Sequence, residues 1–203
     1  MAKASSLFNE MTRRVKKLKS KYMARQVRNE RNAIFVFDEI NMAAFRLLVH
    51  AEYEEYIETK ALESLNIIKA DVAMNGYSTS HIKNIFAIAR QVDKNLNIDK
   101  PFDEQNFKDI VNKIILEAEK KVRDNNGIKK NSFLILSLFC GYEDTSIDPL
   151  LLTNLESYGK DRGNVAHKSL RGVGRTISFL APSAEVQNAE NIRLMLRKHF
   201  YNF

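Results

Sequence analysis

The order of apolar and polar residues along the chain follows the repeat of an α-helix. Over residues 4–30 the apolar positions recur every three or four residues with basic residues around them, which predicts one amphipathic helix. Residues 35–75 show the same spacing over a longer stretch, and Gly76 is a typical helix stop. The apolar residues of the first stripe are Leu7, Phe8, Met11, Val15, Leu18, Tyr22 and Met23.

Later segments repeat this pattern, and polar residues stand where their helices would begin. Such residues accept hydrogen bonds from the free N–H groups of a first helical turn. Residues 131–142 are apolar almost all round, which predicts a buried helix. No segment alternates with a period of two, so we predict an all-α fold. The expected helix starts are Thr79 or Ser80, Asp103, Asp148-Pro149 and Ser183.

Composition supports one helical domain and separates a basic segment from the rest. The chain has 203 residues with only 7 Gly and 3 Pro, too few for a turn-rich sandwich or barrel. Residues 1–31 hold 10 Lys and Arg against 2 Asp and Glu, so their net charge of +8 exceeds the +7 of the whole chain. We therefore expect a basic N-terminal helix over 1–34 that packs on a helical domain over 35–203. Alone, the basic segment fits a phosphate-binding surface and a solvated helix face equally well.

Cysteine content and hydropathy indicate a soluble cytoplasmic protein. The single cysteine, Cys140, excludes an intrachain disulfide and a Cys-rich zinc site, and its apolar surroundings predict a buried side chain. The N-terminal residues lack the apolar core of a signal peptide. The longest apolar run, 133–140, is far shorter than a bilayer requires, so we expect no membrane attachment.

One short stretch combines a strong cation, an imidazole and small residues. It reads Arg162-Gly-Asn-Val-Ala-His167, and an apolar helix face with Leu155 and Tyr158 precedes it. The stretch resembles the R-x4-H signature of HEPN domains, often written R-N-x-I-A-H. One position departs from that pattern, because many members have Asn, Asp or His directly after the arginine. Here Gly163 holds that position and Asn164 follows it.

A second stretch supports the same resemblance. Residues 47–57 read Leu-Leu-Val-His-Ala-Glu-Tyr-Glu-Glu-Tyr-Ile, with an aromatic–glutamate pair followed by another aromatic and an aliphatic residue. This is similar to the early helix of the RiboL-PSP branch of HEPN proteins, and the order of the two motifs also fits. The resemblance covers about residues 35–200. It implies an HEPN-like helical bundle, here with an additional basic N-terminal helix.

The resemblance implies a ribonuclease, and the residue types suit that chemistry. RNA carries its own nucleophile, the 2′-hydroxyl, so cleavage requires proton transfer and charge stabilisation but no metal or cofactor. Histidine transfers protons near neutral pH, and the planar guanidinium of arginine matches phosphate oxygens. We expect His167 to act as general acid or base and Arg162 to contact the phosphate. We expect Asn164 to orient His167 or bind the substrate, and the resemblance implies that Glu54 supports the cleft and orients Arg162. RNA-backbone contacts are expected for Lys168, Arg171 and Arg175.

Helical spacing constrains how the two main residues meet. Residues five apart lie about 140° apart around a helix, so Arg162 and His167 do not share one face. They converge through the long Arg162 side chain, through an irregular helix start at Gly163, or through a second copy of the chain. The resemblance implies the third solution, a homodimer with one composite cleft across an isologous interface. It also implies tRNA or mRNA as the substrate, a role in phage defence or as a toxin, and an antitoxin or defence-system partner protein.

Other interpretations remain open at the level of sequence. A non-catalytic HEPN-like module that binds nucleic acid or a partner protein fits the basic segment and Gly163. A helical scaffold in which residues 162–167 are purely structural, as a solvent-facing helix start, is a third. His50 and Glu54 are four residues apart, but no second His–carboxylate pair accompanies them, so we interpret them as a surface pair and not as metal ligands. Glu54 alone also fits a solvated helix carboxylate.

Overall fold

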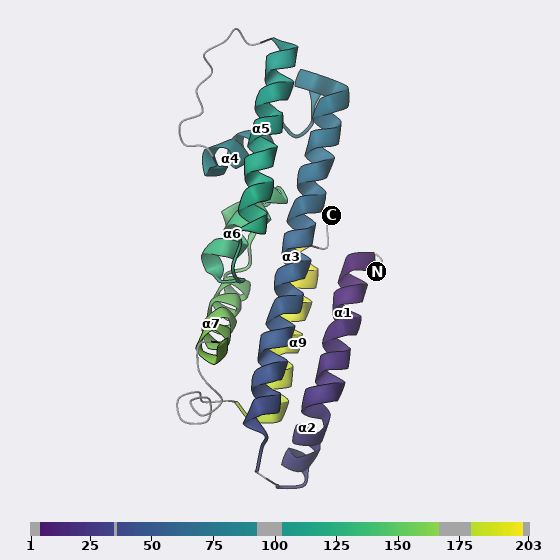
Figure 1. Ribbon diagram of the computed structural model, residues 1–203, viewed down its shortest axis with the longest axis vertical. Coiled ribbons are helices and arrows are strands. Elements are labelled where there is room, and N and C mark those ends of the chain that lie inside the picture. The colour runs from purple at the N-terminus through teal and green to yellow at the C-terminus, as the bar shows by residue number, and fades with distance from the viewer. Residues whose placement is uncertain (1–4, 35, 93–102, 167–179, 201–203) are drawn as a thin grey trace. The chain divides into compact units, whose positions relative to one another are not determined.

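The computed structural model describes residues 5–34, 36–92, 103–166 and 180–200, with the backbone alone at 164–166. Helices make up most of these ranges, and no β-strand occurs within them, which confirms the predicted all-α fold (Figure 1). The chain divides into two compact units. Unit 1 comprises Met1–Tyr56, Gly127–Lys130 and Asp148–Phe203, and unit 2 comprises Ile57–Asn126 and Asn131–Ile147.

The N-terminal arm of unit 1 is α1 (Ser6–Leu18), the π-helical turn η1 (Lys19–Met23) and α2 (Ala24–Arg31). The Ser5 hydroxyl oxygen caps α1 by accepting from the N–H of Phe8 at 3.2 Å. The π turn has a reason in the sequence. Leu18 and Met23 are five residues apart, and the wider turn keeps Met23 on the buried face that Met11 and Val15 begin.

The arm packs within unit 1 on α9 (Pro182–His199), which also contacts α7 (Pro149–Ala166). The first part of α3 (Glu39–Asn75), up to Tyr56, completes this unit. As predicted, Asp148 caps α7, since its carboxylate accepts from the N–H of Leu150 at 2.9 Å. The buried side chains of the unit include Phe8, Phe45, Val49, Tyr53, Tyr56, Leu151, Leu155, Tyr158, Ile192 and Leu196.

Unit 2 contains the rest of α3, η2 (Gly76–Ser78), α4 (Ile82–Val92), α5 (Glu104–Arg123), η3 (Asp144–Ser146) and α6 (Lys130–Phe139) apart from its first residue. Gly76 ends α3 with φ +50°, a conformation that favours glycine. Asp103 caps α5, as expected, by accepting from the N–H of Asn106 at 2.7 Å. Cys140 is buried, which confirms that prediction, whereas Leu134 and Leu138 of α6 are only half-buried.

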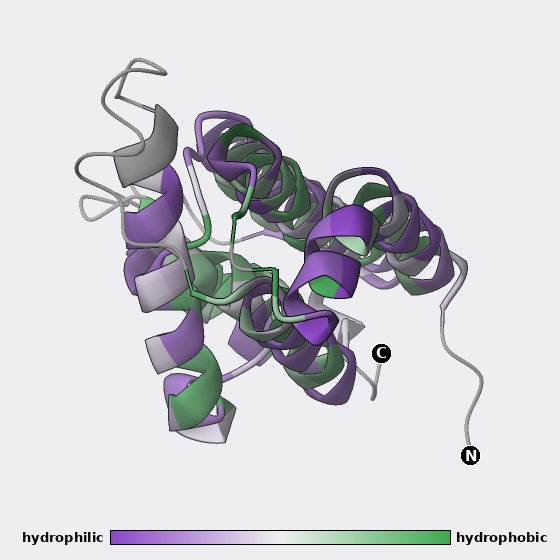
Figure 2. Ribbon diagram, turned by 90° about the horizontal axis from the view of Figure 1, so that it is seen from below, coloured by the Kyte–Doolittle hydropathy of each residue, from purple (hydrophilic) through white to green (hydrophobic). Residues whose placement is uncertain are grey.

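Figure 2 shows hydrophobic and hydrophilic residues on opposite sides of individual helices, the arrangement expected where one face of each helix packs and the other is hydrated. This pattern leaves little continuous apolar length. None of the helices in the described part of the chain carries an apolar stretch that would cross a bilayer.

Candidate functional site

Arg162 lies near the C-terminal end of α7 in unit 1. The helix remains regular from Pro149 to Ala166, so the interpretation of this stretch as a helix start is wrong. The Arg162 side chain is half-buried. Asn164 lies in the same helix, but its side chain is outside the described residues, as are His167, Lys168, Arg171 and Arg175.

His50 of α3 faces the interior of unit 1, and its interpretation as a surface residue is wrong. Its side chain is 1% exposed, and its ring stacks on the Tyr158 ring with 6.1 Å between centroids and 10° between planes. Among the described residues, neither imidazole nitrogen has a hydrogen-bond partner. The carboxylate of Glu54 lies close by, with its Oε2 3.7 Å from Nδ1, beyond hydrogen-bond distance.

Glu54 holds a neighbouring segment of the backbone. Its Oε1 accepts a hydrogen bond from the backbone N–H of Gly127, and its side chain is 16% exposed, so it is not a solvated helix carboxylate. No ion pair joins Glu54 to Arg162 in the described structure, although we expected Glu54 to orient that arginine. The carboxylate therefore fixes the segment that begins at Gly127.

That segment, residues 127–130, forms a strap (the 127–130 strap) between α3 and α7. Glu54 of α3 binds its first N–H, and Glu156 of α7 accepts from the N–H of Lys130 at 3.0 Å. Ile128 is fully buried, which anchors the middle of the strap. Lys129 then lies across α7 so closely that a Cβ on Gly159 would be 2.8 Å from its Cγ.

The charges of two cations in this region act on His50. Burial, followed by the positive charges of Arg162 and Lys129, lowers the pKa of His50 from 6.5 to about 4. The imidazole is therefore neutral at pH 7. The N–H of Lys130 is also the main reason that the pKa of Glu156 is lowered from 4.5, so this carboxylate remains charged.

We call His50, Glu54, Lys129, Tyr158 and Arg162 the α3–α7 cluster. Two long cations beside a buried polar group, half-buried Arg162 and exposed Lys129, suit a phosphodiester, because hydrogen bonds from charged donors to a phosphate are stronger than those from neutral donors. Within the described ranges, no group of three or more His, Cys, Asp or Glu side chains is placed to hold a metal ion. Comparisons with protein families, curated proteins and solved structures find no match for this chain.

Sequence reasoning found Arg162 and Glu54 but missed His50 and the strap. A signal for His50 was present, since Tyr53 and Ile57 follow it by three and seven residues and are buried on the same helix face. Lys129 had no comparable signal. Its place depends on hydrogen bonds that the backbone N–H groups of Gly127 and Lys130 donate to two carboxylates, each far away in the sequence.

Proposed function

We propose that this protein is a metal-independent endoribonuclease that cleaves RNA through the 2′-hydroxyl at a composite Arg162/His167 site of a homodimer. The observation that carries the proposal is the α3–α7 cluster. In it the buried, neutral His50 stacks on Tyr158 of α7 and its pKa is lowered by the charges of Arg162 and Lys129, near the helix end from which the R-x4-H motif continues. The resemblance to HEPN domains supplies the reaction and the role of His167.

The proposed reaction assigns each group one task. An imidazole of His167 takes the proton of the 2′-hydroxyl or returns one to the leaving 5′-oxygen. Arg162 binds the non-bridging phosphate oxygens, on which negative charge grows as the 2′-oxygen attacks. The 2′-oxygen replaces the 5′-oxygen on phosphorus, and the proton that the 2′-hydroxyl loses is balanced by the one that the 5′-oxygen gains. The products are therefore a 2′,3′-cyclic phosphate and a 5′-hydroxyl.

The course of α7 supports a second subunit at the site. Because α7 stays helical from Arg162 to Ala166, an irregular helix start at Gly163 does not bring the motif together. Two solutions remain, the reach of the Arg162 side chain and a second chain. We favour the second chain, because the resemblance to HEPN domains implies it and a two-fold axis would place two copies of the motif opposite each other.

The experiment is incubation of the purified protein with tRNA or total RNA in EDTA. We expect cleavage that leaves 2′,3′-cyclic phosphate ends and that is lost in Arg162→Ala and in His167→Ala. Arg123→Ala is the matched control, because this exposed arginine of α5 pairs only locally with Glu119 at 3.0 Å. Cleavage that requires a divalent metal, or that survives both alanine substitutions, contradicts the proposal.

A second candidate is a non-catalytic module that binds nucleic acid or a partner protein. The exposed cations of the N-terminal arm favour it, because several of them form no ion pair within the described residues. This candidate predicts binding that falls steeply with salt, depends on residues 1–31 and gives no RNA product. Salt-dependent binding without product from any RNA would select it over the ribonuclease.

The biological setting of the proposal comes from the resemblance alone. We propose a cytoplasmic toxin or phage-defence enzyme whose substrate is tRNA or mRNA and whose activity an antitoxin or defence-system partner controls. Induced expression of the wild-type protein should then arrest bacterial growth, while Arg162→Ala at equal expression should not. Equal growth with both proteins would contradict the toxin role, while the ribonuclease activity would still be decided by the RNA-cleavage assay.

A further inference from the structure

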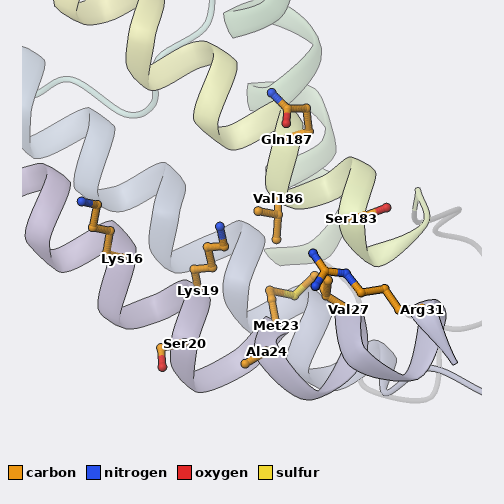
Figure 3. Close-up of a pocket in the computed structure, with 10 residues that line it drawn as sticks. All are labelled: Lys16, Lys19, Ser20, Met23, Ala24, Val27, Arg31, Ser183, Val186 and Gln187. Carbon is orange, nitrogen blue, oxygen red and sulfur yellow. The ribbon is translucent and has the colours of Figure 1, made fainter.

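A hollow of about 470 Å³ lies between the N-terminal arm and α9 within unit 1 (Figure 3). We call it the arm pocket. Cations at its rim are Lys16, Lys19 and Arg31, while apolar side chains, Met23, Val27 and Val186, form its floor. In Figure 3 the ammonium of Lys19 and the guanidinium of Arg31 lie on either side of Val186. The volume is within the range of pockets that hold small organic ligands.

The cations of the arm fall into two groups. Arg14 is half-buried and paired, with Glu52 as its closest partner and Glu55 at 3.5 Å. In contrast, the three cations at the rim are exposed, and none of them forms an ion pair with a described residue. Since Arg14 already fastens the arm to α3, the rim cations are not needed for that contact and stay available to an anion.

The carboxylates near the pocket have other partners. Glu30 accepts from the backbone N–H and the hydroxyl of Ser183 at 2.8 Å and 2.7 Å. Glu190 is paired with Arg193 at 2.6 Å, and that hydrogen bond is the main reason its pKa is lowered from 4.5. The charges of Lys19 and Lys16 also contribute to the lowered pKa of Glu190, but neither carboxylate lies within ion-pair distance of a rim cation in the described structure. The rim therefore holds three cations against two carboxylates that already have hydrogen-bond partners.

The π turn η1 contributes three residues to the lining of the arm pocket. Lys19, Ser20 and Met23 belong to η1 and all line the hollow. A π turn holds one more residue than an α-helical turn, so it rotates the residues that follow it relative to those before it. Such turns are frequent at functional sites. Here it keeps Met23 at the floor while Lys19 remains at the rim. A second hollow, which Arg13 and Lys17 help to line, shares Lys16 and Ser20 with the pocket and extends the cationic surface along α1.

We propose that the arm pocket binds single-stranded RNA, with a phosphate between the rim cations and the adjoining ribose or base against the apolar floor. The inference rests on the proposed function for its biological meaning, since it gives the ribonuclease a second contact with its substrate. Charge selects the phosphate, and the aliphatic floor accepts any base because each base has an apolar face. The site therefore adds affinity without sequence preference.

The test measures binding of a short fluorescein-labelled single-stranded RNA by anisotropy in the His167→Ala background, which keeps every arm and cluster cation. The combined Lys16→Ala, Lys19→Ala and Arg31→Ala variant should raise Kd at least about tenfold at low salt. It should also flatten the plot of log Kd against log salt concentration by about 0.7, the contribution expected of the one phosphate that the rim cations hold.

Two further variants separate the pocket from general attraction. The matched variant combines Lys21→Ala, Arg25→Ala and Arg28→Ala, which removes three exposed arm cations outside the pocket. Its change in log Kd should be less than half of the change in the variant that lacks the rim cations. Ala24→Phe would fill the hollow at an exposed position without changing charge, and it should raise Kd severalfold. Equal losses in both triple variants, or unchanged binding with Ala24→Phe, would overturn the pocket.

The remaining outcomes distinguish this proposal from the ribonuclease proposal. If the wild-type protein cleaves no RNA while the binding differences hold, the proposed function fails and the pocket stands. If the wild-type protein cleaves RNA and the triple variant has an unchanged KM and Kd, the pocket fails alone. Mononucleotide AMP that binds as tightly as the RNA would assign the hollow to a free nucleotide and overturn the assignment to a strand.

Discussion

Two cationic regions of unit 1 differ in how their charges are held. At the arm pocket, Lys16, Lys19 and Arg31 are exposed around an open hollow. In the α3–α7 cluster, the charges of half-buried Arg162 and exposed Lys129 act on a buried imidazole, and two carboxylates fix the backbone of the strap that carries Lys129. Exposed charges add affinity that salt screens, whereas constrained charges set an orientation. Under the proposed function, the arm pocket retains RNA and the α3–α7 cluster belongs to the cleavage site.

The largest effect is expected from Arg162→Lys, which keeps the charge of the cluster but removes the planar fork. An ammonium does not bind two phosphate oxygens in the same fixed geometry, so kcat should fall by about 10²-fold. Lys160→Arg, an exchange of cations at an exposed position of the same helix, should leave kcat unchanged. Single-turnover cleavage measures both, and equal activity of Arg162→Lys and wild type would show that charge alone matters there.

The next effect is a dependence of stability on pH from the buried imidazole. Because the pKa of His50 is lowered from 6.5 to about 4, the unfolded chain binds a proton at higher pH than the folded protein. His50 should therefore weaken the fold as the pH falls from about 6.5 to 4, by about 2–3 kcal/mol, with no loss above this window. Urea unfolding at several pH values measures the slope.

His50→Gln should make that slope shallower, whatever its effect on absolute stability. His199 provides the comparison, because burial lowers its pKa from 6.5 to about 4 as well, without cations among the causes. His199→Gln should also reduce the dependence of the unfolding free energy on pH, independently of His50→Gln. A His50→Gln variant with the slope of the wild type would mean that this imidazole is not buried beside the two cations.

A smaller effect is expected where Glu54 holds the strap. Glu54→Ala leaves the N–H of Gly127 without its acceptor and should lower the free energy of unfolding by about 1–2 kcal/mol. Glu54→Gln keeps an acceptor oxygen and should lose less than half as much. If the two variants unfold at the same urea concentration, the hydrogen bond to Gly127 does not hold the strap.

The smallest effects come from two glycines of α7. Among the described residues, no atom outside the neighbouring backbone of α7 lies within 4 Å of a Cβ on Gly163, so Gly163→Ala should stabilise the protein by about 0.5–1 kcal/mol. At Gly159 the same gain is opposed by the contact with Lys129, so Gly159→Ala should change stability little and raise KM severalfold. Thermal unfolding and steady-state cleavage measure these changes; equal gains in stability with an unchanged KM would mean that Lys129 moves aside without consequence.

Periodicity predicted the fold because each helix buries one face. The caps at Asp103 and Asp148 followed from local rules, since each carboxylate binds an N–H two or three residues away. The π turn at Lys19–Met23 was not predicted, because Tyr22 four residues after Leu18 already fitted an ordinary helix. Only packing decides that Met23 takes the buried position.

The candidate site was less predictable because its connections are not local. The bond from Gly127 to Glu54 spans 73 residues, and the bond from Lys130 to Glu156 spans 26. A sequence read in windows of one helix does not reveal such pairs. Arg162 was found through a motif, and the unfavourable angle between residues five apart correctly drew attention to the problem of convergence.

The most direct test of the central claim is subunit mixing. Arg162→Ala and His167→Ala proteins are each purified, combined under conditions that exchange subunits, and assayed with RNA in EDTA. A composite site predicts that the mixture cleaves RNA although neither parent does, because mixed dimers bring an intact Arg162 and an intact His167 together. A mixture that exchanges subunits and remains as inactive as its parents would contradict a site shared between two chains.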